Sequence, residues 1–226
     1  MAGNESSTQG GVVVVGAGPM IGTAVARRFA RQGRPVTMIA RSPETMEIAV
    51  KTVVDDVDGG SVRGLTADVT DDAAIAEALD DAAAAHGVPE VVVYNAALIR
   101  ADRVGDLSAS QLAETLAVNA LGALTVAARL APRMVDRGHG SLLFTGGMPW
   151  VKPEYLSLSL GKAALRTVAD LLAAEYGARG LHVATVTVCD VVAPGTAYDP
   201  DLIAAEFEAL HAEPPGHWRR EVVFQR

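Results

Sequence analysis

The stretch that decides the fold of this chain is VVVVGAGPMIG, residues Val12–Gly22. An apolar β-branched run comes first, a glycine turn follows, and an Ala-rich amphipathic stretch begins at Thr23. This order is typical of a buried parallel strand that leads through a tight turn into a helix, whose N-terminus can bind a pyrophosphate. The stretch predicts dinucleotide binding. The alternative is a plain strand-turn-helix in which the glycines serve only the turn.

Length and composition limit the classes of protein to which the chain can belong. It has 226 residues, half of them hydrophobic, which is enough for one sizeable core. The net charge of -8 and the scarcity of aromatic residues argue against nucleic acid and anionic membranes as partners. Because Cys189 is the only cysteine, no intramolecular disulfide can form, and a cytoplasmic location is predicted. We expect no membrane-spanning run, and a disordered tail over residues 1–10.

Short apolar runs alternate with amphipathic stretches along the rest of the chain, residues 11–226. The runs predict strands at Gly11–Val15, Pro35–Ala40, Val62–Thr66, Glu90–Tyr94, Ser141–Thr145, His182–Val188 and Glu221–Phe224. The stretches between them predict helices at Ile21–Arg31, Glu44–Asp56, Asp71–His86, Ala109–Arg137, Tyr155–Tyr176 and Asp201–His211. Strands that are Val-rich on both faces imply a covered parallel sheet, so we predict a single doubly wound α/β (Rossmann) domain of about seven strands. A ligand then binds beyond the carboxyl ends of the strands, and functional residues should follow each strand.

Four short motifs lie after the first, third and fourth predicted strands and in the longest predicted helix. They are Gly16-x-x-x-Met20-Ile21-Gly22, Ala67-Asp68-Val69, Tyr94-Asn95-Ala96-Ala97 and Val118-Asn119-Ala120-x-Gly122. In order and spacing they resemble the short-chain dehydrogenase/reductase family over nearly the whole chain, from about Gly11 to Phe224. The chain departs from the family at Met20, where glycine is usual.

The resemblance implies a nicotinamide dinucleotide cofactor at the glycine turn and the strand ends. Asp68 would accept a hydrogen bond from the adenine amino group, the backbone after it would contact the base, and Lys162 would hold the nicotinamide ribose. The family's Pro-Gly pair after the sixth strand is altered to Val188-Cys189, and Pro194-Gly195-Thr196 is a candidate for its displaced equivalent. The cofactor positions predicted in this way are Gly16, Gly18, Met20, Ile21, Gly22, Asp68, Val69, Asn95, Ala96, Ala97, Lys162 and Thr196.

The end of the second predicted strand bears on the choice between NAD and NADP. An NAD site needs a carboxylate about 20 residues after the glycines, to accept a hydrogen bond from the ribose 2′-hydroxyl. Ala40-Arg41-Ser42 stands there instead. A guanidinium pairs with a 2′-phosphate, and the Ser42 hydroxyl would add a hydrogen bond. NADP is therefore predicted over NAD, unless Arg41 is only a solvated residue at the end of a strand.

The catalytic half of the resemblance is incomplete. The family reduces a carbonyl with a Ser, an Asn that helps to fix a proton-relay water, and a Tyr that stands four residues before a Lys. Asn119 and Lys162 match the Asn and Lys positions. The Tyr position is Leu158, and the Ser position is Gly147, or Gly146 if the register shifts by one. Because leucine cannot donate a proton, the family's mechanism cannot run unaltered.

Four hydroxyl side chains are candidates for the missing groups. Tyr155 lies seven residues before Lys162, on nearly the same face of the helix, and is the candidate acid. Thr145 and Ser159 are candidates to orient the carbonyl, and Tyr94 is a further candidate. The alternatives are structural: Tyr155 as a rim or interface aromatic, Ser159 as a helix-surface serine and Thr145 as an ordinary strand residue.

Two functions remain open. The first is an NADP(H)-dependent oxidoreductase that acts on a small-molecule carbonyl or alcohol with a relocated acid. The second is a protein that binds NADP(H) but serves a non-redox role, as a cyclase, isomerase or lyase, or a regulatory role. The resemblance also implies a homodimer or homotetramer in which the helices carrying Asn119 and Lys162 pair, and a substrate loop at about residues 189–217. The acids and histidines of that loop match no metal-ligand spacing, so no metal is predicted.

Overall fold

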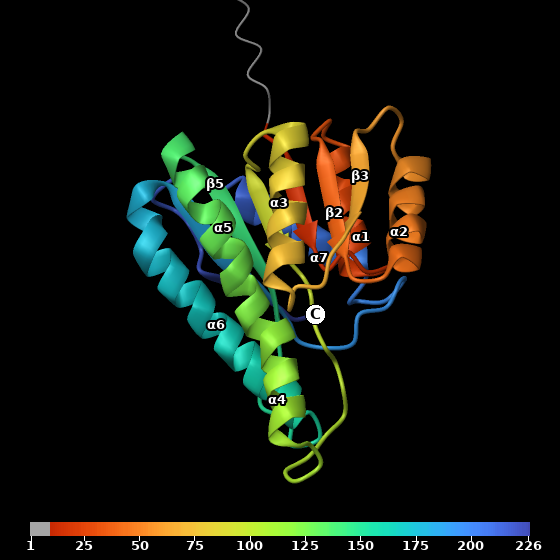
Figure 1. Cartoon of the computed structure of the whole chain (residues 1–226), viewed down its shortest axis with the longest axis vertical. Coiled ribbons are helices and arrows are strands. Elements are labelled where there is room, and N and C mark those ends of the chain that lie inside the picture. The colour runs from red at the N-terminus through yellow and green to blue at the C-terminus, as the bar shows by residue number, and fades with distance from the viewer. Residues whose placement is uncertain (1–9) are drawn as a thin grey trace, which may run out of the picture.

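One sheet of parallel strands forms the centre of the molecule (Figure 1). The computed structural model describes residues 10–226, so the predicted tail over residues 1–10 lies outside the described residues except for Gly10. The strands are β1 (Val12–Val15), β2 (Val36–Ala40), β3 (Val62–Thr66), β4 (Val91–Tyr94), β5 (Gly140–Gly147), β6 (Leu181–Val188) and β7 (Glu221–Phe224). Their order in the seven-stranded sheet is β3-β2-β1-β4-β5-β6-β7. The direction of winding reverses between β1 and β4, which is where ligands bind in such sheets.

Helices cover both faces of the sheet (Figure 1). They are α1 (Ile21–Ala30), α2 (Pro43–Asp56), α3 (Asp72–His86), α4 (Ala109–Leu116), α5 (Gly122–Arg137), α6 (Leu156–Tyr176) and α7 (Pro200–His211), with a π-helical turn η1 (Ala117–Leu121) and a 3-10 turn η2 (Gly177–Arg179). Side chains of α1, α2 and α7 pack on one face of the sheet, and those of α3, α5 and α6 pack on the other. The doubly wound α/β fold is thus confirmed, and each predicted strand is present, with ends that differ by at most two residues.

The valine run of β1 is continuous because both of its faces are covered. All four side chains are buried. Val12 and Val14 pack in the layer that contains α1 and α7, whereas Val13 and Val15 pack in the layer that contains α3, α5 and α6. Since β1 pairs with β2 on one side and β4 on the other, the glycine turn that follows it lies at the middle of the carboxyl edge of the sheet.

The long helix predicted over residues 109–137 is not one α-helix. It is divided into α4, the π-helical turn η1 and α5. Asn119 lies on η1, and its buried side chain accepts a hydrogen bond from the backbone N–H of Leu98 at 2.8 Å and donates one to the Leu98 carbonyl at 3.0 Å. An extra residue in a helical turn changes the direction of the side chains on it, and such turns occur often at functional sites. The spacing of apolar residues in the sequence does not predict this π-helical turn.

Residues 109–137 also correct the expectation that no run could span a membrane. Within the described residues, this helical run is long and apolar enough to cross a bilayer by length and composition alone, with a mean hydropathy of 1.3. Half of its most apolar window is buried inside the protein, where Val126, Leu130 and Met134 belong to the core between the sheet and its helices. A core helix passes the same test of length and composition.

Candidate active site

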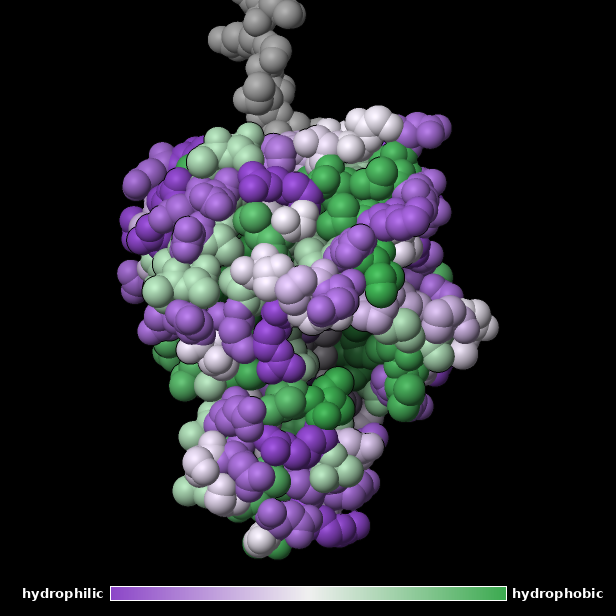
Figure 2. All heavy atoms as spheres, turned by 45° about the vertical axis from the view of Figure 1, so that its right-hand side comes forward, coloured by the Kyte–Doolittle hydropathy of each residue, from purple (hydrophilic) through white to green (hydrophobic). Residues whose placement is uncertain are grey.

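A cavity of about 830 Å³ opens at the carboxyl edge of the sheet. It is lined by the segments that follow the strands β1 to β6 and by the first turns of α6. Figure 2 shows a hollow in this face of the molecule with hydrophobic side chains gathered around it. Most of the predicted cofactor positions line this cavity: Gly16, Gly18, Met20, Ile21, Arg41, Ser42, Asp68, Val69, Asn95, Ala96, Ala97 and Lys162.

The turn after β1 suits a pyrophosphate. Gly16 has a φ of 85°, and a Cβ there would lie 2.2 Å from the backbone nitrogen of Ala96, so only glycine fits. The helix α1 begins at Ile21 without a side-chain cap and without an acidic residue in its first turn. Its partial positive charge therefore faces the cavity without a neutralising group from its own N-terminus. Gly22 packs behind the turn, where a Cβ would lie 2.7 Å from the Cα of Ala17.

The other end of the cleft carries charges suited to the adenosine half of a dinucleotide. The Arg41 side chain is 71% exposed, and its guanidinium lies 3.9 Å from the Asp68 carboxylate. Asp68 accepts hydrogen bonds from the backbone and the hydroxyl of Thr70, at 2.9 and 2.7 Å. The Ser42 hydroxyl caps α2 by accepting from the backbone of Thr45 at 3.2 Å, and it donates to Glu44 at 2.6 Å. A hydrogen bond donated by Ser42 to a 2′-phosphate would therefore compete with the one that it donates to Glu44, and not with the helix cap.

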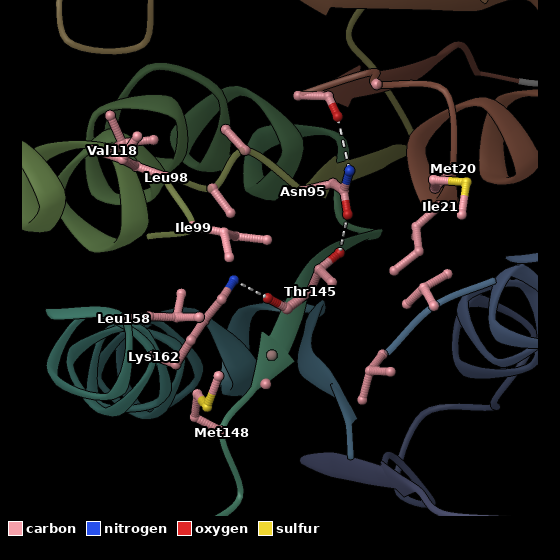
Figure 3. A pocket seen from close by; sticks show the side chains of 18 of the residues that line it. Met20, Ile21, Asn95, Leu98, Ile99, Val118, Thr145, Met148, Leu158 and Lys162 are labelled. Atoms are coloured by element: carbon pink, nitrogen blue, oxygen red, sulfur yellow. Dashed lines mark hydrogen bonds between the residues drawn. The ribbon is translucent and has the colours of Figure 1, made fainter. Parts of the chain in front are cut away.

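A chain of hydrogen bonds connects the glycine turn to α6 (Figure 3). Asn95 donates to the Gly16 carbonyl at 2.7 Å and accepts from the Thr145 hydroxyl at 2.8 Å. The Lys162 ammonium donates to the Thr145 carbonyl at 2.7 Å. Burial, assisted by the charge of Arg166, lowers the pKa of Lys162 to about 8. Asn95, Thr145 and Lys162 thus form one polar core in a cleft whose other walls are largely apolar.

Both positions that lack the family's hydroxyls lie beside Lys162. Leu158 is buried and faces the cavity next to Lys162 (Figure 3). A Cβ on Gly147 would lie 3.9 Å from the nearest side-chain carbons of Lys162, in ordinary contact, whereas one on Gly146 would lie 2.4 Å from the Thr187 hydroxyl. A side chain therefore fits at Gly147 and not at Gly146, which favours Gly147 as the serine position.

Three of the four candidate hydroxyls are committed to structural hydrogen bonds. The Tyr94 hydroxyl donates to the Val118 carbonyl at 2.6 Å, and burial raises the pKa of Tyr94. The Thr145 hydroxyl donates to Asn95, as described above. The Ser159 hydroxyl accepts from the backbone N–H of Lys152 at 3.2 Å, in a buried position that does not line the cavity. Tyr155 lines the cavity, and no group in residues 10–226 forms a hydrogen bond with its hydroxyl.

A buried carboxylate fixes the backbone around Tyr155. Asp102, from the loop after β4, accepts a hydrogen bond from the backbone of Ser157 at 2.8 Å and a second from the Ser157 hydroxyl, while its carbonyl accepts from Leu156 at 3.2 Å. Burial opposes the charge, but the hydrogen bonds from Ser157 hold the pKa of Asp102 below its usual value. No local sequence pattern predicts this cap of α6, because 55 residues separate its two partners.

Asn119 does not reach the cavity, so its predicted place in a proton relay is not supported. Its amide forms both of its hydrogen bonds with the Leu98 backbone, and it therefore positions the loop after β4. The close approach of α6 is possible because residue 161 is glycine: a Cβ on Gly161 would lie 2.6 Å from the Cβ of Asn119.

The predicted substrate loop, at about residues 189–217, contributes fewer residues to the lining of the cavity than expected. Only residues 189–192 of this region line the cavity, since α7 packs its apolar side chains into the core. Thr196 is exposed away from the cleft, and its hydroxyl donates to the Ala193 carbonyl at 2.7 Å. The structure therefore does not bring Thr196 into the predicted cofactor site.

The turn after β5 contains two residues that the sequence analysis missed. Met148 has a φ of 48°, the only positive value at a non-glycine residue between Gly10 and Arg226. Arg166, one helical turn after Lys162, donates to the carbonyls of Gly147 at 2.9 Å and Met148 at 3.4 Å. Strained backbone persists where the surroundings fix it, and here Arg166 holds the turn that places the Met148 side chain in the cavity (Figure 3).

A second polar cluster, at the opposite end of the sheet, has the residue types of a hydrolase but not the access. The Ser141 hydroxyl lies 2.9 Å from His211 Nδ1, and His211 Nε2 lies 3.5 Å from Glu90, which also pairs with Arg34. Ser141 is buried at the start of β5. Hydrogen bonding from His211 and the charge of Arg34 hold the pKa of Glu90 well below its usual range. We interpret this cluster as a structural anchor.

Known proteins resemble this chain in sequence and in fold. A family model described as short chain dehydrogenase matches residues 11–200. The chain is 32% identical over 180 residues to the probable oxidoreductase EphD of Mycobacterium tuberculosis, covering 77% of this chain and 30% of the relative. It is 28% identical to D-threitol dehydrogenase of Mycolicibacterium smegmatis, covering 77% of this chain and 67% of the relative. The alcohol dehydrogenase of Thermococcus sibiricus, solved with 5-hydroxy-NADP, is 25% identical with a TM-score of 0.82, covering 96% of this chain and 98% of the other. The chain thus spans about a third of the length of EphD.

Proposed function

Because the chain belongs to the short-chain dehydrogenase family, we propose that it is an NADP(H)-dependent oxidoreductase that interconverts a small-molecule carbonyl compound and its alcohol, with Tyr155 as the proton donor. Its relatives are named as oxidoreductases and dehydrogenases. The observation that carries the proposal is a single cleft with a helix N-terminus, a buried lysine and an uncommitted tyrosine hydroxyl along it.

The residues of the cleft fit the parts of NADP(H). The open N-terminus of α1 would bind the pyrophosphate, Arg41 the 2′-phosphate, and Asp68 the adenine. Lys162 would hold the nicotinamide ribose, beside Thr145. NADP(H), when bound, supplies or accepts the hydride. In the reducing direction, Tyr155 would donate its proton to the carbonyl oxygen as the carbonyl carbon receives the hydride, so that an alcohol and a tyrosinate result.

Two measurements test this function. Titration of the protein with NADPH, followed by nicotinamide fluorescence, should show saturable binding. NADPH oxidation should then be detected with a member of a panel of aldehydes and ketones. If neither NADPH nor NADH binds up to millimolar concentration, the proposal is wrong.

Arg41→Asp should move the cofactor preference from NADPH toward NADH. The change removes a charge-assisted partner of the 2′-phosphate and adds a repulsive charge, an effect of about 1.5–3 kcal/mol. The ratio of the two dissociation constants should therefore change by about 10- to 150-fold. Lys51→Asp, an exposed charge reversal on α2 outside the cleft, is the matched control. If Arg41→Asp keeps the wild-type ratio, Arg41 does not select the cofactor.

Activity should fall as the pH rises through about 8. Burial lowers the pKa of Lys162 to about 8, so its amine is charged below that pH and neutral above it. The charged form is the one that donates strongly to a ribose hydroxyl. We expect kcat/KM for NADPH to be level below pH 7 and to decline about tenfold per pH unit well above 8. Lys162→Met should give a low value without this decline. A wild-type profile that stays level to pH 9.5 would contradict the role of Lys162.

We propose further that the protein is a cytoplasmic homodimer or homotetramer that pairs through α5 and α6. Leu121, Leu124, Leu160 and Leu171 are exposed on this side of the molecule. Exposed apolar side chains of this size mark interaction surfaces when they gather. Light scattering at micromolar concentration should report a dimer or tetramer, and Leu171→Glu should shift it toward the monomer. Val104→Glu, at an exposed loop position, is the control. A monomeric wild type would refute the pairing.

A non-redox role is the second candidate, and a specific observation favours it. Leu158 and Gly147 remove both of the family's hydroxyls from the walls beside Lys162. A protein that binds NADPH tightly but oxidises it with no aldehyde or ketone in the panel would support this role.

A further inference from the structure

We propose that the substrate of this cleft is an alcohol or carbonyl compound with an apolar hydrocarbon body, held between the loops that follow β4, β5 and β6. The inference rests on the proposed function for the reacting group, and on the walls of the cavity for the rest of the molecule. Polyhydroxylated substrates such as sugars and polyols are excluded by the same walls.

The walls beyond Lys162 are mostly apolar. The loop after β4 contributes Leu98 and Ile99, the turn after β5 contributes Met148, α6 contributes Leu158, and the segment after β6 contributes Val191. Figure 3 shows Ile99 near the end of the Lys162 side chain, Leu158 beside that side chain and Met148 nearer its base. These side chains come from four separate elements, so the apolar surface is built around this space.

Few polar groups near this end are free apart from the Tyr155 hydroxyl and the charged side chains. Thr145 donates to Asn95, and Asn119 is used on the Leu98 backbone. Asp190 accepts from the backbone of Val191 at 2.7 Å. A hydroxyl group that is buried without a partner loses its hydrogen bonds to water and gains none. A polyol would leave several hydroxyls in this state, whereas a hydrocarbon chain would leave none.

The rim of the cavity extends the apolar surface outward. Ile99 is 69% exposed, Trp150 is 61% exposed and Val191 is 79% exposed, on three different loops. Ile99 and Val191 line the cavity, and Trp150 lies between two residues of the lining, Pro149 and Lys152. Exposed apolar side chains that gather around one opening indicate a binding site, because a ligand that covers them removes their surface from water. Lys152 and Asp190 are the charged side chains at this edge of the opening.

Trp150 provides a direct measurement of binding that needs no turnover. The protein has two tryptophans, and Trp218 stacks on His182 at the other end of the sheet. A Trp218→Phe protein loaded with NADP⁺, which is not fluorescent, would be titrated with 2-hexanone, 2-octanone and 2-decanone, and the emission of Trp150 recorded. We expect saturable shifts, with the dissociation constant falling about fourfold per added methylene. D-Threitol and D-glucose should give no saturable shift.

Variants at the rim separate a specific pocket from general surface binding. Ile99→Asp and Val191→Asp should each weaken 2-decanone binding about tenfold or more, because they place a charge on the apolar wall. Val104→Asp is the matched control: Val104 lies on the same loop as Ile99, is 88% exposed and does not line the cavity. Its affinity for 2-decanone should be unchanged. NADPH affinity within twofold of wild type shows that each variant is folded.

The outcomes distinguish this inference from the proposed function. Chain-length-dependent binding without NADPH oxidation would keep the apolar ligand class and remove the redox function. NADPH oxidation by a sugar or a polyhydroxy ketone, with no binding of the alkanones, would keep the redox function and overturn the ligand class. Equal affinity for all three alkanones, or equal weakening by Val104→Asp, would also overturn it.

Discussion

Tyr155→Phe is expected to lower the turnover number of carbonyl reduction by about 100-fold or more, the usual effect of losing a general acid. The substitution keeps the ring that lines the cavity and removes only the hydroxyl. That hydroxyl is the one candidate donor in the cleft that no other described group binds, whereas those of Tyr94 and Thr145 are committed to Val118 and Asn95. NADPH affinity should barely change, because Arg41 and Lys162 are untouched.

This test is specific for the proton donor because it measures turnover and cofactor affinity separately. Steady-state kcat would be compared with the dissociation constant for NADPH in the wild type, in Tyr155→Phe and in Tyr176→Phe. Tyr176 ends α6, far along the helix from the cleft, and its substitution should leave both quantities unchanged. If Tyr155→Phe retains wild-type turnover, the proton comes from water, and the relocated-acid mechanism is wrong.

The fold was predictable from sequence because its determinants are local. Runs of valine that are apolar on both faces mark the buried strands, and Asp71, Ser108 and Asp199 cap helices within three residues of their own position. The signals that mark each element therefore lie inside it or beside it. The position of the cleft followed from the parallel order of the strands.

The chemistry of the cleft was less predictable because its determinants are distant in sequence. Helical spacing placed Ser159 on the face of Lys162, but its hydroxyl is bound by the Lys152 backbone. Asn119 matches a family motif, but η1 directs its amide to Leu98. Asp102 caps α6 from the loop after β4, and Arg166 of α6 holds the turn after β5. The periodicity of apolar residues within one segment cannot predict such contacts between segments. Spacing predicts which face a side chain occupies, and only the fold determines its partner.

The second large effect is expected from Leu158→Tyr, which restores the family's spacing of four residues before Lys162. Leu158 faces the cavity beside Lys162, so the new hydroxyl would reach the polar core of the cleft. In the Tyr155→Phe background, turnover on a carbonyl compound that the protein accepts should rise by about 100-fold or more, the effect of gaining a positioned acid. Adding Gly147→Ser should raise it further, because there is room for a Cβ at that position. Gly146→Ser is the control and should instead lower the melting temperature, since its Cβ would meet Thr187.

Combining the two substitutions decides between the mechanisms. If Tyr155 is the native acid, Leu158→Tyr in the Tyr155→Phe background should recover turnover, because one hydroxyl of the cleft replaces another. The two effects should then be non-additive, as is usual for groups that perform one role. A different result would point to another native chemistry. If the wild type and Tyr155→Phe both lack detectable turnover and Leu158→Tyr creates it, the cofactor cleft is intact and its native chemistry is not carbonyl reduction. Failure of Leu158→Tyr to support turnover in either background, with NADPH still bound, would show that the wall at Leu158 does not face the reacting carbon.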